Sequence, residues 1–174
     1  MIRFAQALSA LLPLLTLATL DIAPPAAAAP PMVARAVRVH DGDTFTAALD
    51  SRTCQVRLWG IDAPELAQTY GTSATLTLRS LLDRTTFTLT IRSIDRYGRR
   101  VADITLPGGL NVNQEMVRRG AAWWYREYAR KAADLQAAEY QARRDHAGLW
   151  ALPMPQPPWD FRRQTRARPI SPRR

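Results

Sequence analysis

The chain has almost none of the residues that build disulfides or soft-metal sites. Cys54 is its only cysteine, so no disulfide can form within one chain. Its two histidines, His40 and His146, are far apart in the sequence and have no cysteine or histidine neighbours at ligand spacing. This pattern argues against a zinc site. We expect Cys54 to be a small buried residue in a strand, and both histidines to have surface or structural roles.

Lysine is also nearly absent, although the chain is strongly basic. Lys131 is the only lysine, so arginine supplies nearly all of the positive charge behind a formal net charge of +9. A basic surface attracts polyanions such as nucleic acids or anionic lipids. Hydrophobic residues make up 47% of the chain, which argues against wholesale disorder. Its length of 174 residues is enough for one domain with extensions.

Several catalytic motifs are missing as well. The sequence contains no glycine-rich phosphate-binding loop and no serine in a nucleophile-elbow motif. Beyond the N-terminus, no segment is long and apolar enough to span a bilayer. These absences leave the oxygen chemistry of carboxylates as the better-supported possibility, although the composition is still compatible with a Ser-His-Asp triad.

The N-terminus has the three parts of a signal peptide. A short positive start precedes an apolar run at 4–20, and small residues follow in "APPAAAAP". Cleavage after Ala28 fits best, so 1–28 is the predicted signal peptide and the mature protein is expected to be periplasmic or secreted. The alternative is a retained membrane anchor, but Pro13 interrupts the run. After cleavage we expect no stable membrane span.

Alternating apolar and polar residues predict five short strands. The pattern is clearest at 85–95, where Phe87, Leu89 and Ile91 alternate with threonines. The other strands are expected at 33–40, 45–50, 54–61 and 99–106. Asp41-Gly42, between the first two strands, is a strong hairpin signal.

Helical spacing of apolar residues predicts three helices, at 68–83, 111–120 and 126–148. Five strands with one inserted helix and two later helices fit the α+β class, as a five-stranded OB-fold β-barrel with three α-helices. From periodicity alone, a generic α+β sandwich fits nearly as well. We place the domain at 33–153.

Residues 154–174 are rich in proline and arginine and are predicted to be a C-terminal tail. Arginines in such a tail can neutralise nucleic-acid phosphates without specifying sequence. The alternative is a solvated tail that aids solubility. In either case we expect it to add nothing to the core of the barrel.

Four carboxylates stand at two predicted chain reversals. Asp41 and Asp43 lie at the first hairpin, and Asp62 and Glu65 follow the third strand. Carboxylates brought together repel one another unless a cation joins them. Ca²⁺ and Mg²⁺ prefer oxygen ligands of this kind. Considered one motif at a time, the better explanation is structural, with Asp41 and Asp43 as turn residues and Asp62 as the cap of a loop.

Five motifs in order carry a family resemblance. The chain resembles bacterial exported members of the staphylococcal nuclease (thermonuclease) family between Val33 and Trp150, through "DGDT", "VRLWGIDAPE", "DRYGRR", "VNQEMVRRGAAWWY" and "GLW". The resemblance implies an OB-fold barrel with three helices. It also implies Ca²⁺-dependent hydrolysis of DNA and RNA that leaves 3′-phosphates.

The resemblance further implies a site for one Ca²⁺ ion. Asp43 and Asp62 would be its carboxylate ligands, and the main-chain carbonyl of Ala63 would be another. Many relatives have threonine at the place of Ala63, but alanine keeps the carbonyl. Asp41 would contribute more weakly, from outside the ligand set.

The resemblance assigns catalytic roles to three further residues. Glu65 would orient or deprotonate the attacking water, and Arg57 and Arg99 would bind the scissile phosphate. Those roles agree with general chemistry, because an arginine fork matches phosphate oxygens two bonds at a time.

Aromatic residues complete the implied site. Tyr97 and Tyr125 would contact the substrate, although Tyr128 could take the place of Tyr125 because the segment is about one residue shorter than in the best-known member. For Trp123 and Trp124 we favour core packing over stacking on bases.

Two other classes of function compete with a nuclease. A non-catalytic OB-fold protein would bind nucleic acid without cutting it, and an envelope protein would use the tail to hold anionic surfaces. The first is disfavoured because the implied catalytic set is complete, namely Asp43, Arg57, Asp62, Glu65 and Arg99. The second predicts no turnover with any metal. We expect DNA and RNA as substrates, no obligate protein partner and a monomer.

Overall fold

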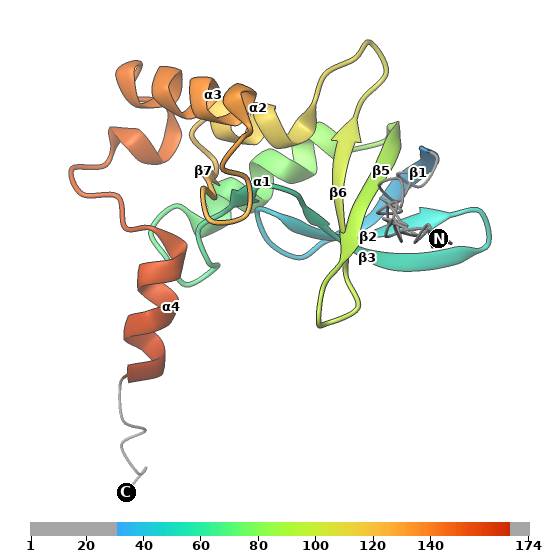
Figure 1. Ribbon diagram of the computed structural model, residues 1–174, viewed down its shortest axis with the longest axis horizontal. Coiled ribbons are helices and arrows are strands. Elements are labelled where there is room, and N and C mark those ends of the chain that lie inside the picture. Colours follow the sequence, from blue (N-terminus) through green and yellow to red (C-terminus); the bar gives the residue numbers. More distant parts are fainter. Residues whose placement is uncertain (1–30, 168–174) are drawn as a thin grey trace, which may run out of the picture.

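Five strands close into a barrel in the computed structural model, which describes residues 31–167 (Figure 1). Around the barrel the strands follow the order β1-β2-β3-β6-β5. Only β3 and β6 pair in parallel, and the other neighbours are antiparallel. Their bounds are β1 Met32–Val39, β2 Thr44–Leu49, β3 Arg52–Leu58, β5 Thr86–Ile94 and β6 Arg100–Thr105. The predicted five-stranded OB-fold barrel is confirmed.

The alternation in the strands sends one set of side chains into the barrel. Phe45, Val56, Phe87, Leu89 and Ile104 are all at most 1% exposed. The rings of Phe45 and Phe87 meet edge to face with centroids 5.7 Å apart, an arrangement that adds to the burial of apolar surface. Cys54 is buried and free, as expected.

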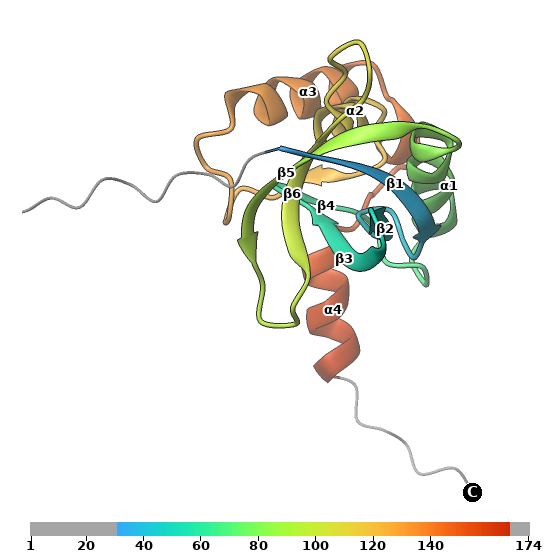
Figure 2. The same ribbon diagram turned by 90° about the vertical axis from the view of Figure 1, so that its right-hand side faces the viewer.

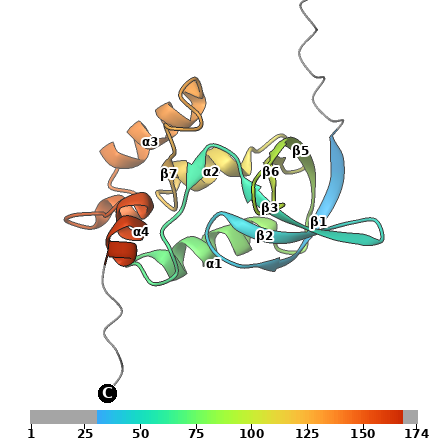
Figure 3. The same cartoon turned by 60° about the horizontal axis from the view of Figure 1, so that its bottom comes forward.

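Helices cover one side and one end of the barrel, as Figures 2 and 3 show for α1, α2 and α3. Their bounds are α1 Gly71–Leu82, α2 Val112–Arg118 and α3 Ala133–Arg144, and a 3₁₀ turn, η1, spans Gly148–Ala151. Helix α1 buries Ala74, Leu78 and Leu82, which share one face at a spacing of four. The side chain of Asn111 caps α2 by accepting a hydrogen bond from the backbone NH of Gln114.

The third predicted strand, 54–61, ends earlier than expected. Strand β3 stops at Leu58, and Gly60 turns the chain with φ +76°. The chain then forms the short strand β4, Ile61–Asp62, which pairs with β7, Trp123–Trp124. Opposite Trp123 in this second small sheet lies Asp62, which the pairing holds at the end of the barrel.

A fourth helix lies within the predicted tail. Helix α4, Pro158–Ala167, projects from the body of the protein, and its N-terminal half lies against it (Figures 1 and 2). Near the start of the helix, Trp159 packs on a second core cluster made by Trp123, Ala142, Leu149 and Trp150. The expectation that this segment adds nothing to the barrel core holds for the main cluster, yet the segment does extend the hydrophobic interior.

Some predictions fall outside the residues that the structure describes. The predicted signal peptide at 1–28 and the last three tail arginines, Arg168, Arg173 and Arg174, are among them. Between residues 31 and 167, no helix is both long and apolar enough for a membrane span.

Candidate active site

One guanidinium holds two buried carboxylates together at the end of the barrel. Arg57 Nη1 donates to Asp43 Oδ1 at 2.7 Å, and Nη2 donates to Asp62 Oδ1 at 2.8 Å. Asp62 is fully buried and Asp43 is 3% exposed. The loop that carries Asp43 is joined to β3 by a hydrogen bond from the backbone NH of Leu58 to the Asp43 carbonyl. The fold thus brings together three of the predicted site residues.

Burial and charge oppose each other at this cluster. Burial lowers the pKa of Arg57, but the charges of Asp43 and Asp62 outweigh it and raise the pKa above its usual value. Burial also raises the pKa of Asp62, and the hydrogen bond from Arg162 opposes that shift. A buried ion pair of this kind costs desolvation, so removing one partner leaves an uncompensated charge.

The "DGD" loop fits closely against the rest of the site. A Cβ on residue 42 would lie 2.6 Å from the Cβ of Ala63 and 2.8 Å from that of Ala74, so only glycine permits this approach. The backbone NH of Ala63 donates to Asp43 Oδ2 at 2.9 Å. Gly42 therefore lets the Asp43 carboxylate reach the segment that follows Asp62.

Asp41 organises the same loop. Its Oδ1 accepts hydrogen bonds from the backbone NH groups of Asp43, at 3.0 Å, and Thr44, at 2.7 Å. Burial, with the nearby charge of Asp43, raises the pKa of Asp41 to about 6. The geometry gives Asp41 a supporting place beside the Asp43 carboxylate.

This raised pKa predicts a stability change. The folded-state pKa of about 6 exceeds the ordinary value of 3.8, so the contribution of Asp41 to stability is complete below pH 3.8 and is lost as pH rises through 6. Asp41→Asn keeps the Oδ1 acceptor and cannot ionise. In chelator, we expect it to exceed wild type in stability at pH 7 by on the order of 1 kcal/mol and to match it near pH 4.

Thermal melts of wild type and variant at both pH values measure this difference. Asp50→Asn, at an exposed residue in the turn between β2 and β3, is the matched control and should not change the comparison. Equal melting temperatures of wild type and Asp41→Asn at pH 7 would show that the buried charge has no cost.

Glu65 joins the cluster through a residue that the sequence did not single out as a site residue. Arg162 of α4 donates from Nη1 to Glu65 Oε1 at 2.8 Å and from Nη2 to Asp62 Oδ2 at 2.7 Å. Its Nη1 also lies 3.2 Å from Asp62 Oδ1. Burial lowers the pKa of Arg162, but its bonds to the two carboxylates outweigh this and raise it. The residue is therefore cationic.

Tyr125 lies where α4 meets the body. The Tyr125 and Trp159 rings stack with an interplanar angle of 4° and centroids 5.4 Å apart. The centroids of the Tyr125 and Tyr128 rings are 4.9 Å apart. Burial raises the pKa of Tyr125, and the charge of Asp62 adds to the shift. Trp123 and Trp124 are buried, as expected for core residues. Neither tyrosine is distinguished by these contacts as the substrate residue.

Arg99 and Tyr97 lie at the tip of the hairpin between β5 and β6. Asp95 Oδ2 accepts from Arg99 Nε at 2.7 Å, and the guanidinium of Arg99 lies 5.4 Å from the centre of the Tyr97 ring. In the parallel pairing of β3 with β6, Arg57 lies opposite Val101, which is two residues after Arg99. In the described part of the chain, no hydrogen bond or ion pair joins Arg99 to the Asp43 and Asp62 carboxylates.

The donors at this site suit a hard cation, because they are all oxygen atoms. Asp43 and Asp62 both reach the guanidinium of Arg57, so their carboxylates lie on either side of one positive group. Within residues 31–167, no three acidic, histidine or cysteine side chains come together as a metal-binding group. Further ligands would therefore have to be main-chain carbonyls, such as that of Ala63, or water.

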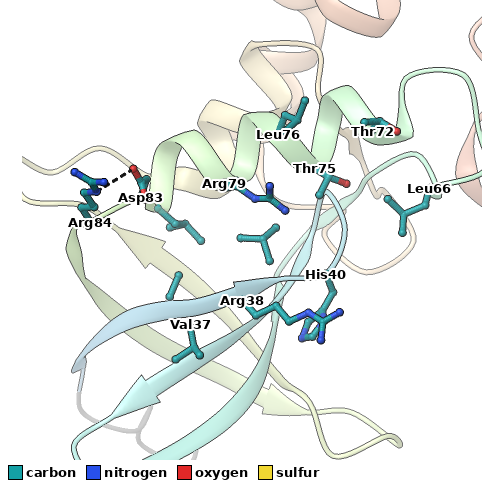
Figure 4. A pocket seen from close by; sticks show the side chains of 13 residues that line it. Val37, Arg38, His40, Leu66, Thr72, Thr75, Leu76, Arg79, Asp83 and Arg84 are labelled. Atoms are coloured by element: carbon teal, nitrogen blue, oxygen red, sulfur yellow. Dashed lines mark ion pairs between the residues drawn. The ribbon is translucent and has the colours of Figure 1, made fainter.

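A separate groove of about 630 Å³ lies between β1 and α1 (Figure 4). Arg38 and Arg79 line it together with the exposed apolar side chains of Val37 and Leu76. Neither Asp43 nor Asp62 lines this groove. The groove is therefore separate from the acidic cluster, the name used here for Asp43, Asp62 and Glu65 with the carboxylate of Asp41 beside them.

Comparisons with known proteins agree with the geometry. The family model described as "Staphylococcal nuclease homologue" matches residues 55–152. An "Uncharacterized endonuclease" of Escherichia coli O157:H7 is 43% identical over 128 residues, covering 74% of this chain and 83% of its own length. A "Micrococcal nuclease" of Shigella flexneri is 41% identical over 140 residues, covering 75% of this chain and 80% of its own.

Proposed function

Because the chain belongs to the staphylococcal nuclease family and is a phosphodiester-cleaving nuclease, we propose that it acts on both DNA and RNA with Ca²⁺ as its cofactor and releases 3′-phosphates. The observation that carries this proposal is the joining of Asp43 and Asp62 by Arg57, with Glu65 in the same hydrogen-bonded network. Nucleases of this family depend on metal in general.

Asp43 and Asp62, with the Ala63 carbonyl, would hold the cation. When bound, a divalent cation polarises a phosphoryl oxygen and supplies positive charge that favours the transition state. Arg57 would donate two hydrogen bonds to the phosphate oxygens, since its fork matches their spacing. The parallel pairing of β3 with β6 supports a second contribution from Arg99, which precedes β6.

Glu65 would take a proton from the attacking water. Its Oε1 accepts from Arg162, which leaves Oε2 for the water. The carboxylate lies in a half-exposed position, with 39% of its side chain accessible, while Asp62 beside it is buried. Its exposure suits Glu65 to exchange protons with solvent, whereas the ionised form of Asp62 is favoured by the charges of Arg57 and Arg162.

Metal removal should abolish activity. We expect the mature chain to cut single- and double-stranded DNA and RNA in Ca²⁺, to cut poorly in Mg²⁺ and to stop in excess chelator, because no protein cation can replace the bound metal charge. Gel analysis of end-labelled substrates measures the rate, and phosphatase treatment identifies the ends. Full activity in chelator would contradict the metal assignment, and 3′-hydroxyl products would contradict the proposed mechanism.

We also propose export through the segment at 1–28, with the mature protein acting as a monomer in the periplasm or outside the cell. Its basis is the apolar run between a positive start and small residues. N-terminal sequencing of the protein expressed with its own N-terminus in a Gram-negative host should find Ala29 or a neighbouring residue first. Recovery of the uncut chain in membranes would favour the retained anchor.

A further inference from the structure

Arg162 reaches the acidic cluster from a helix that is about one hundred residues away in the sequence. Its guanidinium contacts both oxygens of Asp62 and one oxygen of Glu65. Asp62 Oδ1 also accepts from Arg57 Nη2, so two guanidinium groups meet at one carboxylate oxygen. Arg162 is thus placed beside the arginine that is expected to bind phosphate.

The position of Arg162 is fixed by aromatic packing. Trp159, three residues earlier on the same face of α4, stacks on Tyr125 and meets Trp123 edge to face with centroids 5.6 Å apart. Such ring pairs stabilise the packing beyond the apolar area that they bury. The segment before the helix is also fixed, because Gln68 Nε2 donates to the carbonyl of Gln156 at 3.0 Å.

We propose that Arg162 is a further substrate-binding residue of the active site, whose guanidinium moves from the carboxylates to the scissile phosphate when nucleic acid binds. This inference rests on the proposed nuclease function. Arginine suits this role because its planar fork binds either a carboxylate or a phosphate with two parallel hydrogen bonds.

The charge balance of the cluster favours this exchange. The four carboxylates of Asp41, Asp43, Asp62 and Glu65 exceed the two guanidinium groups by two negative charges at pH 7. A bound divalent cation would bring the cluster to neutrality. Without Arg162 the same cluster would keep one net negative charge and would repel the phosphate.

Release of Arg162 also frees the ligand atoms. Asp62 Oδ1 accepts from two arginines, and Oδ2 accepts from Arg162, so a cation that binds Asp62 must compete with this side chain. Loss of Arg162 should therefore weaken phosphate binding while leaving cation binding at least as tight. A residue that only stabilises the fold would not separate these two quantities.

The test compares Arg162→Ala, Arg162→Lys and Arg166→Ala in the full mature chain. Arg166 lies on α4 with an exposed side chain and removes the same charge, so Arg166→Ala is the matched control. We expect Arg162→Ala to lower kcat/KM about 100-fold in saturating Ca²⁺, as for loss of one transition-state donor. Arg162→Lys should recover part of this loss, and Arg166→Ala should show only the small, salt-dependent loss expected of a tail arginine that contacts no carboxylate of the cluster.

Calcium titration by calorimetry gives the second readout. Lower kcat/KM with calcium affinity equal to or tighter than wild type supports the role in phosphate binding. Unchanged kcat/KM in Arg162→Ala would overturn it, and increased kcat/KM would identify α4 as an inhibitory cover instead. Lost calcium binding would overturn it in favour of a positioning role.

Near-UV circular dichroism establishes that each variant folds, and Arg162→Lys carries the test if Arg162→Ala does not. Wild-type cleavage decides the proposed function, whereas the ratio of variant to wild type decides the role of Arg162.

Discussion

Replacing Glu65 by glutamine is expected to lower kcat by about 10²- to 10⁴-fold, the range typical for loss of a general base. The amide keeps the size of the side chain and an oxygen that can accept the hydrogen bond from Arg162 Nη1, now 2.8 Å from Oε1. It cannot take a proton from water. Nucleic-acid binding should remain close to that of wild type, because Asp43, Arg57 and Asp62 are unchanged.

Single-turnover cleavage in Ca²⁺ measures the rate, and fluorescence anisotropy with a labelled oligonucleotide measures binding. Glu127→Gln is the matched control, since Glu127 is exposed and outside the acidic cluster. A Glu65→Gln protein that cuts at the wild-type rate would make Glu65 a structural residue.

Arg57→Lys is expected to lower kcat/KM by about 10²- to 10³-fold. Arg57 uses two different nitrogens to hold Asp43 and Asp62, at 2.7 and 2.8 Å, and its side chain is only 19% exposed. An ammonium group is a point charge and cannot span two carboxylates or bind a phosphate with a planar fork. The variant should also melt at a lower temperature, because one carboxylate loses a partner in a buried site.

Arg52→Lys provides the control for the exchange of arginine for lysine. Arg52 is exposed at the other end of β3 from Arg57, so this variant should keep both its activity and its melting temperature. An Arg57→Lys enzyme as active as wild type would contradict two-bond contact between Arg57 and the phosphate.

Strand periodicity predicted the five strands because each strand has one buried face, whereas the family resemblance decided for a barrel over an α+β sandwich. The pattern failed only where a glycine interrupted it, since φ +76° at Gly60 ends β3 and starts the short strand that carries Asp62. The "DGD" motif marked a turn, but its closeness to Ala63 depends on how the loop packs against α1. The local sequence indicates that the chain turns at Gly42, but it does not indicate that the turn packs against Ala63 and Ala74.

Helix α4 was missed because prolines and arginines dominate its segment. Pro158 at the first helical position, Asp160 in the first turn and Arg166 in the last turn are the signals that could have indicated it. The ion pair between Arg162 and Asp62 could not be predicted in this way, because it depends on how Trp159 docks on Tyr125. Periodicity carries no information about contacts at such separation.

Calcium titration of wild type and Asp62→Asn by calorimetry, without nucleic acid, tests most directly whether the acidic cluster holds the cation. Asparagine keeps one oxygen for Arg57 and removes the fully buried charge of Asp62. We expect wild type to bind one ion per chain and Asp62→Asn, shown to be folded by circular dichroism, to bind none in the same range. Equal stoichiometry and affinity in both proteins would contradict a calcium site built on Asp62.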